Sequence, residues 1–252
     1  MGRNVFITGA TSGIGRETAI AFAKNGDNLL LCARRKDKLD EMKQGLEDLY
    51  KVDVTVFELD VTDRAAVAEK VPAMIESIGH VDILVNNAGL AQGLDAFEDS
   101  SIDDMETMID TNVKGLLYVS RTVLPYMLKR NIGHIINLGS TAGIYAYAKG
   151  AVYCATKAAV KTLSDGIRID TIESDIKVTT IQPGIVETPF SEVRFHGDKE
   201  KAAAVYAGVD ALQPEDIADI ILFASNRPRR VQISDITIMA NQQATGFMIA
   251  KK

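Results

Sequence analysis

Short apolar runs alternate with longer amphipathic stretches along most of the chain. Runs such as VFIT, NLLLC and HIINL are apolar nearly throughout, which is typical of strands in a sheet that is covered on both faces. The strands predicted in this way are Val5–Thr8, Asn28–Cys32, Val54–Glu58, Ile83–Asn86, His134–Leu138, Val178–Ile181 and Ile236–Met239. The helices predicted between them are Gly13–Lys24, Arg35–Tyr50, Arg64–Ile78, Ile102–Lys129, Val152–Ser174 and Pro214–Ser225.

This alternation predicts an α/β fold, because strands joined through helices form right-handed crossovers and a parallel sheet. We expect a doubly wound parallel sheet of about seven strands with helices on both faces. The chain contains no low-complexity linker, no hinge and no internal repeat, so residues 1–252 are interpreted as a single domain. Sheets of this kind bind ligands at the carboxyl ends of their strands.

Composition restricts the kinds of partner. Apolar residues make up 46% of the chain and charged residues 25%, with a net charge of −6 and no run of Lys or Arg, so nucleic acid is not an expected partner. No apolar run approaches the ~20 residues that span a bilayer. The two cysteines, Cys32 and Cys154, have neither disulfide-scaffold nor metal-ligand spacing, so no metal site is assigned and a cytoplasmic location is expected.

A glycine-rich loop, TGATSGIG (Thr8–Gly15), joins the first predicted strand to the first predicted helix. Gly9 allows a sharp turn, Gly13 leaves room for a pyrophosphate against bare backbone, and Gly15 allows the helix to pack close to the sheet. The helix N-terminus offers free N–H groups and partial positive charge to the anion. The predicted nucleotide contacts in this loop are Gly9, Thr11, Ser12, Gly13, Ile14 and Gly15.

The residues that follow the second strand indicate which dinucleotide binds. An NAD-binding protein is expected to carry Asp or Glu at this strand end, about 20 residues past the loop, to bind the ribose 2′-hydroxyl. This chain has Arg34 and Arg35 there. A guanidinium can hold a 2′-phosphate through charge-assisted hydrogen bonds, so the pair favours NADP. The alternative is that both arginines simply begin a solvated helix.

Two further strand ends fit around a nucleotide. Asp60 follows the third strand and can accept from the adenine amino group, while the backbone of Val61 lines the pocket. The small residues after the fourth strand let the backbone pass close to the cofactor ribose, and they are Asn87, Ala88 and Gly89. Either motif alone is also an ordinary turn signal.

Three side chains form a candidate catalytic group. Ser140 closes the fifth strand, and Tyr153 and Lys157 follow at the start of a long predicted helix, four residues apart and therefore on one face. A phenol with a pKa near ~10 is a poor base at neutral pH, and we expect the nearby ammonium and the positive nicotinamide of the oxidised cofactor to lower that pKa. Tyr153 would then exchange the substrate hydroxyl proton while Ser140 donates to the carbonyl oxygen and the cofactor carries hydride.

Taken together, these motifs resemble the short-chain dehydrogenase/reductase family over essentially the whole chain. The matching segments are TGATSGIG, LDV (Leu59–Val61), NNAG (Asn86–Gly89), Asn112, Ser140, YCATK (Tyr153–Lys157) and QPG (Gln182–Gly184). The resemblance implies a Rossmann-like fold and a catalytic tetrad that adds Asn112 to Ser140, Tyr153 and Lys157. It also implies that Tyr153 and Lys157 contact the cofactor, together with Pro183, Gly184, Val186 and Thr188.

The family keeps a mobile lid over the nicotinamide and substrate, here expected at about residues 185–210. Family members usually associate through the long helices, so a homodimer or homotetramer is implied. Arg194 in the lid either captures a substrate carboxylate or is a solvated charge. Tyr145 and Tyr147 either line the pocket or pack in the core, Cys154 is expected to pack in the core, and His196 has no evident partner.

Within the family, four stretches resemble the NADP-dependent 3-hydroxy acid dehydrogenases, which act on serine and allo-threonine. They are Ala33–Arg35, Glu106–Asn112, Gly133–Gly143 and Ser191–Asp198. One alternative is a 3-oxoacyl-thioester reductase, for which Lys129 and Arg130 are a small candidate surface for an acidic carrier protein, or a broad carbonyl reductase. A non-enzymatic NADP-binding sensor is the third interpretation, which the complete set of four catalytic residues disfavours.

Overall fold

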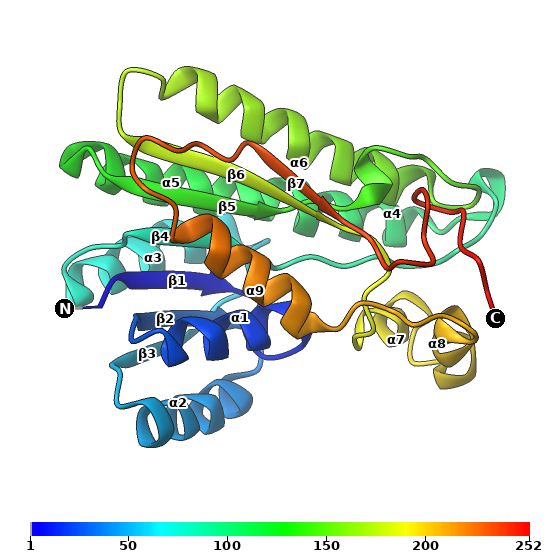
Figure 1. The fold of residues 1–252 in the computed structure, drawn as a ribbon, viewed down its shortest axis with the longest axis horizontal. Coiled ribbons are helices and arrows are strands. Elements are labelled where there is room, and N and C mark those ends of the chain that lie inside the picture. The colour runs from blue at the N-terminus through cyan, green and yellow to red at the C-terminus, as the bar shows by residue number, and fades with distance from the viewer. Residues whose placement is uncertain (1) are drawn as a thin grey trace.

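The computed structural model describes residues 2–252, and it contains one seven-stranded parallel sheet with helices on both faces (Figure 1). The strand order is β3-β2-β1-β4-β5-β6-β7, and every neighbouring pair is parallel. The predicted fold class is confirmed. The strands are β1 (Asn4–Thr8), β2 (Asn28–Ala33), β3 (Val54–Glu58), β4 (Ile83–Asn86), β5 (Gly133–Leu138), β6 (Ile176–Pro183) and β7 (Asp235–Ile238).

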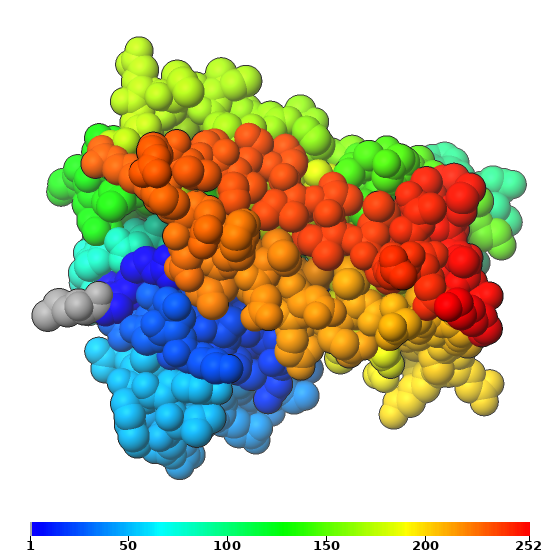
Figure 2. Space-filling model, viewed as in Figure 1, coloured from blue at the N-terminus to red at the C-terminus, as the bar shows by residue number. Residues whose placement is uncertain are grey.

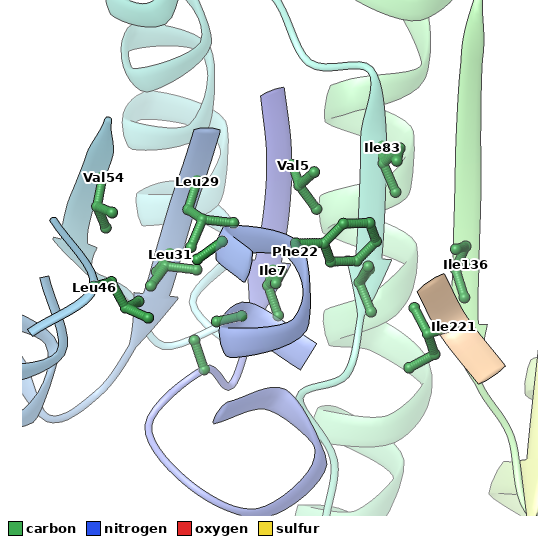
Figure 3. Close-up of a cluster of buried hydrophobic side chains, with 14 of the residues drawn as sticks. Val5, Ile7, Phe22, Leu29, Leu31, Leu46, Val54, Ile83, Ile136 and Ile221 are labelled. Atoms are coloured by element: carbon green, nitrogen blue, oxygen red, sulfur yellow. The ribbon is translucent and has the colours of Figure 1, made fainter. Parts of the chain in front are cut away.

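Successive residues of each strand face opposite sides of the sheet, and both sides are apolar. In β1, Val5 and Ile7 belong to one core cluster and Phe6 to the other. The first cluster packs under α1 (Gly13–Lys24), α2 (Lys36–Tyr50) and α9 (Pro214–Ser225). Figure 3 shows Phe22 of α1 among the strand side chains of this cluster. The second cluster packs under α3 (Arg64–Ile78), α5 (Leu116–Arg130) and α6 (Ala151–Asp170).

The long helix predicted at Ile102–Lys129 is wrong in one respect, because a π-helical turn divides it. The structure has α4 (Ile102–Ile109), the turn Asp110–Gly115 and then α5. Two tertiary contacts fall in this turn. Asn112 is held by hydrogen bonds to residues outside the helix, and Gly115 packs so close to Val61 that a Cβ there would lie 2.7 Å from a Val61 methyl group. Such turns inside α-helices are frequent at functional sites.

The predicted end of the Val152–Ser174 helix is also wrong, because α6 ends at Asp170. The next residues form turns in which side-chain hydroxyls bond to backbone carbonyls. Thr171 Oγ1 donates to the carbonyl of Ile167 at 2.8 Å, and Ser174 Oγ donates to the carbonyl of Thr171 at 2.6 Å. Side-chain hydroxyls compete in this way with the backbone hydrogen bonds of a helix. The helix can therefore end before the helical spacing of apolar residues ends in the sequence.

Residues 185–210, interpreted from the sequence as an irregular lid, contain two short helices, α7 (Phe190–Arg194) and α8 (Lys199–Tyr206). The C-terminal residues 242–252 fold back beside this segment at the carboxyl end of the sheet (Figures 1 and 2). Gly208 accepts from the backbone N–H of Lys252 at 2.9 Å, and Asp210 N–H donates to the Gln242 side chain at 2.7 Å. The C-terminal residues therefore support the segment from within the same chain.

The winding of the sheet reverses between β1 and β4, which lie side by side. This is where a doubly wound sheet opens a crevice at its carboxyl edge. No helix between residues 2 and 252 is long and apolar enough to cross a membrane. Both cysteines are buried and unpaired, with Cys154 in a core cluster as expected. The cytoplasmic location and the homo-oligomer stay predictions.

Candidate active site

A cavity of about 1180 Å³ lies at the carboxyl ends of the strands. It extends from the glycine loop after β1 to the start of α6 and to residues 185–210. Among the predicted cofactor residues, those that line it are Gly9, Thr11, Ser12, Gly13, Ile14, Arg34, Arg35, Asp60, Val61, Asn87, Ala88, Gly89, Tyr153, Lys157, Pro183, Gly184, Val186 and Thr188. Gly15 and Asn112 lie behind this wall. Ser140, which follows β5, lines the cavity as well, so the structure brings motifs from six strand ends to one cavity.

The glycine loop is held from below by the loop that follows β4. Gly9 has φ +66°, and a Cβ there would lie 2.9 Å from the Ala88 Cα. Asn87 donates from its side-chain amide to the carbonyls of Thr8 and Gly9, at 3.0 and 3.1 Å. A Cβ at Gly15 would lie 2.5 Å from the Gly9 oxygen. Gly15 therefore acts by close packing against the loop, and its predicted direct contact with the nucleotide is not supported because Gly15 is not in the cavity wall.

The two arginines after β2 lie on the rim of the cavity, and both are exposed. Arg35 donates from Nη2 to Thr11 Oγ1 at 2.8 Å and to Ser12 Oγ at 3.3 Å, so its guanidinium lies against the glycine loop. Asp60 lines the same end, and its carboxylate accepts from the backbone and hydroxyl of Thr62 at 2.9 and 2.8 Å. Asp60 thus forms a turn and also faces the cavity.

Ser140, Tyr153 and Lys157 meet at the other end of the cavity. Ser140 follows β5 and accepts at Oγ from the Ala142 N–H at 3.1 Å. Tyr153 lies in the first turn of α6 and lines the cavity together with Ser140. Lys157 Nζ lies 5.9 Å from the Tyr153 ring centroid and donates to the Leu138 carbonyl at 2.8 Å. Both Tyr153 and Lys157 are buried.

The protein groups by themselves raise the pKa of Tyr153, and the expected lowering by Lys157 together with the positively charged nicotinamide stays a prediction. Burial is the largest influence and raises the pKa of the phenol, and the neighbouring Tyr147 raises it further. The Arg194 guanidinium and the Ser140 hydrogen bond lower it. Burial also lowers the pKa of Lys157 to about 8, which weakens that ammonium as a source of positive charge. Among the protein groups, the Arg194 guanidinium is the nearby cation that lowers the pKa of Tyr153.

Asn112, the residue implied by family resemblance, is buried behind Gly89. Its Oδ1 accepts from the Leu90 N–H at 2.8 Å, and its Nδ2 donates to the Leu90 carbonyl at 2.8 Å and to Thr156 Oγ1 at 3.1 Å. These bonds tie the π-helical turn to the loop after β4 and to α6. A Cβ at Gly89 would lie 3.1 Å from Asn112 Oδ1 and 3.4 Å from Lys157 Nζ.

Arg194, at the end of α7, lies over the ring of Tyr153. Its Cζ is 5.1 Å from the ring centroid of Tyr153, 5.2 Å from that of Phe190 and 5.9 Å from that of Tyr147. Its Nη2 donates to the Tyr147 hydroxyl at 2.9 Å. Its Nε is buried, and residues 2–252 offer it no hydrogen-bond partner. The guanidinium therefore carries a desolvated donor, and Arg194 is part of the cavity wall.

Several contacting residues were not identified from the sequence. The Tyr206 hydroxyl lies 2.7 Å from Ser191 Oγ and 3.2 and 3.3 Å from the carbonyls of Val186 and Thr188, which fastens residues 186–191 over the cavity. Gln243 accepts from the Ile185 N–H at 2.9 Å. These residues come from α8 and from the C-terminal segment, and no local motif marks them.

Two other sequence interpretations change. His196 does have a partner, because its Nε2 lies 3.0 Å from Asp104 Oδ2 of α4. Arg130, half of the candidate carrier-protein surface, pairs with Asp82 at 3.0 Å. Tyr147 lines the cavity, whereas Tyr145 is not part of the wall that the structure describes. In the described part of the chain, no group of three or more His, Cys, Asp or Glu side chains is placed to hold a metal.

Comparison with known proteins agrees with this arrangement. Residues 3–199 match the family model described as short chain dehydrogenase. The chain is 42% identical to the NADP-dependent 3-hydroxy acid dehydrogenase of Schizosaccharomyces pombe over 252 residues, covering 100% of this chain and 97% of the relative. It is 45% identical to the protein of the same name in Salmonella typhi over 241 residues, covering 95% and 96%.

A solved structure described as the closed form of serine dehydrogenase complexed with NADP⁺ superimposes with a TM-score of 0.91 at 42% identity, covering 99% of both chains. The fold, the glycine loop and the Ser-Tyr-Lys geometry are thus accompanied by similarity along the full length. The chain belongs to the short-chain dehydrogenase family.

Proposed function

We propose that this protein oxidises small 3-hydroxy acids at the 3-hydroxyl group with NADP⁺, and reduces the corresponding 3-oxo acids with NADPH. It is an NADP-dependent oxidoreductase that acts on CH–OH groups, like the relatives that it matches over nearly their full length. The observation that carries the choice of substrate is the Arg194 guanidinium, which lies 5.1 Å from the Tyr153 ring with a buried donor unpaired.

The residues of the cavity fit NADP. The glycine loop exposes bare backbone to the cavity. A Cβ at Gly13 would lie 3.3 Å from the Thr188 side chain, so the space above the loop exists because Gly13 has no side chain. Arg34 and Arg35 supply positive charge at the end where a 2′-phosphate would be held, and Tyr153 and Lys157 lie at the nicotinamide end. Bound NADP⁺ supplies the hydride acceptor and a positively charged ring.

Tyr153 moves the proton in this proposal. The raised pKa keeps the buried phenol protonated at neutral pH, the state that can protonate a carbonyl oxygen during reduction. During oxidation the phenol must first lose its proton, and the Arg194 guanidinium favours this loss. Ser140 lines the cavity together with Tyr153, and in this proposal it donates to the carbonyl oxygen of the substrate and fixes its position.

Arg194 sets the substrate class because a carboxylate completes its hydrogen bonds. One nitrogen already donates to Tyr147, and Arg194 lines the cavity, where an anion can accept from the remaining N–H groups of the guanidinium. A charge-assisted bond of this kind is stronger than a neutral one, and a buried donor without an acceptor costs about 1–3 kcal/mol. A neutral alcohol gains neither effect, so acids are the preferred substrates.

The deciding experiment follows NADP⁺ reduction with L-serine, D-serine, both allo-threonines, 3-hydroxypropionate and 3-hydroxybutyrate, with NAD⁺ in parallel. The amide 3-hydroxybutanamide has the shape of 3-hydroxybutyrate without its charge and serves as the matched control. We expect kcat/KM for the acid to exceed that for the amide at least tenfold, and Arg194→Ala to remove most of this difference. Equal rates with acid and amide, or faster reduction of a 3-oxoacyl-thioester, would contradict the proposal. NADP⁺ binding without turnover on any substrate would indicate a sensor.

A further inference from the structure

The chain immediately after α7 is tied to two elements that are distant in sequence. His196 Nε2 lies 3.0 Å from Asp104 Oδ2 on α4, where the aspartate is 19% exposed and the histidine 57%. The carbonyl of Arg194 accepts from the N–H of Gly93, in the loop after β4, at 2.9 Å. Both contacts act within two residues of the guanidinium that faces the substrate. They connect residues 185–210 to the body of the protein.

The backbone between these contacts has an uncommon conformation. His196 has φ +52° and Gly197 has φ +89°, so two successive residues lie in the left-handed region. Residues other than glycine rarely adopt it, because the Cβ approaches the backbone. The turn ends α7, since the N–H of His196 donates to Val193 at 3.2 Å and that of Gly197 to Glu192 at 2.8 Å. A side-chain contact at His196 therefore restrains a turn that its own backbone preference does not favour.

Packing alone does not fix the guanidinium on the α4 side. A second, small cavity of about 60 Å³ lies there, and Gln92, Asp104, Tyr153 and Arg194 are all in its wall. Incomplete packing leaves side chains free to shift, whereas a close-packed neighbour would hold them. The polar contacts of residues 194–196 then add a restraint on this side of Arg194 to the contacts that its guanidinium makes with aromatic rings.

We propose that the His196–Asp104 pair is a positioning contact for Arg194, holding the guanidinium where it meets the substrate carboxylate. This inference rests on the proposed function, because it requires that Arg194 binds that carboxylate. Neither His196 nor Asp104 touches the reacting atoms in this scheme. Their effect is on affinity for acidic substrates, through the turn that carries Arg194.

The test compares KM and kcat for 3-hydroxybutyrate and 3-hydroxybutanamide in His196→Ala, Asp104→Ala and the double variant. We expect each single variant to raise KM for the acid about three- to fivefold, within the range of one hydrogen bond, with kcat within twofold. KM for the amide and the dissociation constant for NADP⁺ should stay unchanged. The double variant should match the single variants, because both remove the same contact.

Two further variants separate positioning from general loosening. Asp104→Asn keeps an oxygen that accepts from His196 and should recover most of the affinity for the acid. His80→Ala removes a similar exposed pair, His80–Asp82 at 3.2 Å just before β4, and should leave the acid-to-amide ratio unchanged. Thermal unfolding checks that each variant is folded.

The outcomes distinguish this inference from the proposed function. If Arg194→Ala lowers the preference for acid over amide but His196→Ala and Asp104→Ala do not, the positioning role is wrong and the substrate proposal stands. If Arg194→Ala affects acid and amide equally, the substrate proposal fails and the positioning role fails with it. An equal rise in KM for acid and amide in the His196 and Asp104 variants also overturns the positioning role, because the contact would then serve only general stability.

Discussion

Arg34 and Arg35 offer the sharpest test of how this chain selects its nicotinamide cofactor. We expect Arg35→Ala to reduce activity with NADP⁺ far more than activity with NAD⁺. The Arg35 guanidinium also bonds to Thr11 and Ser12 of the glycine loop at 2.8 and 3.3 Å. Loss of these two bonds affects both cofactors alike, because both share the pyrophosphate. The ratio of the two activities therefore isolates the contribution of the 2′-phosphate.

The magnitude follows from the exposure of the two side chains. Hydrogen bonds to charged groups are worth about 1.5–3 kcal/mol, and solvent screening places exposed arginines at or below the lower end of this range. A loss of about 1–1.5 kcal/mol corresponds to a fall of roughly 5- to 13-fold in the NADP⁺-to-NAD⁺ ratio of kcat/KM. If Arg34 also reaches the phosphate, Arg34→Ala acts similarly, and the double variant lowers the ratio by roughly 30- to 150-fold.

The assay measures kcat/KM with each cofactor at fixed 3-hydroxybutyrate, together with dissociation constants from cofactor fluorescence at low and high salt. Lys36→Ala is the matched control, because it removes an adjacent positive charge that pairs instead with Asp40. Binding of NADP⁺ to the wild-type protein should weaken with salt more than binding of NAD⁺. An unchanged cofactor ratio in the double arginine variant would refute the assignment of the 2′-phosphate to this strand end.

Three further predictions test the catalytic group and the core. Tyr153→Phe should lower kcat at least about 100-fold while NADP⁺ affinity changes less than about threefold, as turnover and fluorescence titration would reveal. Asn112→Ala should lower the free energy of unfolding in urea by about 2–5 kcal/mol, because the buried N–H and C=O of Leu90 lose their partner; a loss below about 1 kcal/mol would contradict this. Burial lowers the pKa of His134 to about 3, below its unfolded value near ~6.5, so the unfolded chain binds the extra proton as the pH falls. Below about pH 6.5, the free energy of unfolding should therefore fall with decreasing pH more steeply than in His134→Gln, by up to about 1.4 kcal/mol per pH unit. The glutamine amide can keep the bond to Thr179, so this variant removes only the titrating group. Identical slopes in the two proteins would argue against a neutral buried histidine.

The local order of elements was readable from the sequence because each signal is short in range. Apolar runs, glycines and helix-start residues act on their immediate neighbours, and the predicted bounds of α1, α3 and α9 agree with the structure. The α3 start, for example, is set by Asp63, whose side chain accepts from the Ala66 N–H. The parallel, doubly wound sheet then follows from strand and helix alternation, and it brings the predicted strand ends to one cavity.

The sequence by itself therefore determined the fold class, the cofactor loop and the Ser140, Tyr153 and Lys157 group, whose members lie at strand ends or one helical turn apart. Only the tertiary structure decided the features that depend on contacts between distant segments. The π-helical turn around Asn112 is accompanied by bonds to Leu90 and Thr156, and the position of Arg194 involves contacts from Gly93 and Tyr147. The pKa of Tyr153 also depends on tertiary structure, because burial, the neighbouring Tyr147 and the guanidinium of Arg194, 41 positions away in the chain, all shift it. Local pattern fixes which residues share a strand or a helical face, whereas desolvation and long-range hydrogen bonds exist only once the chain has folded.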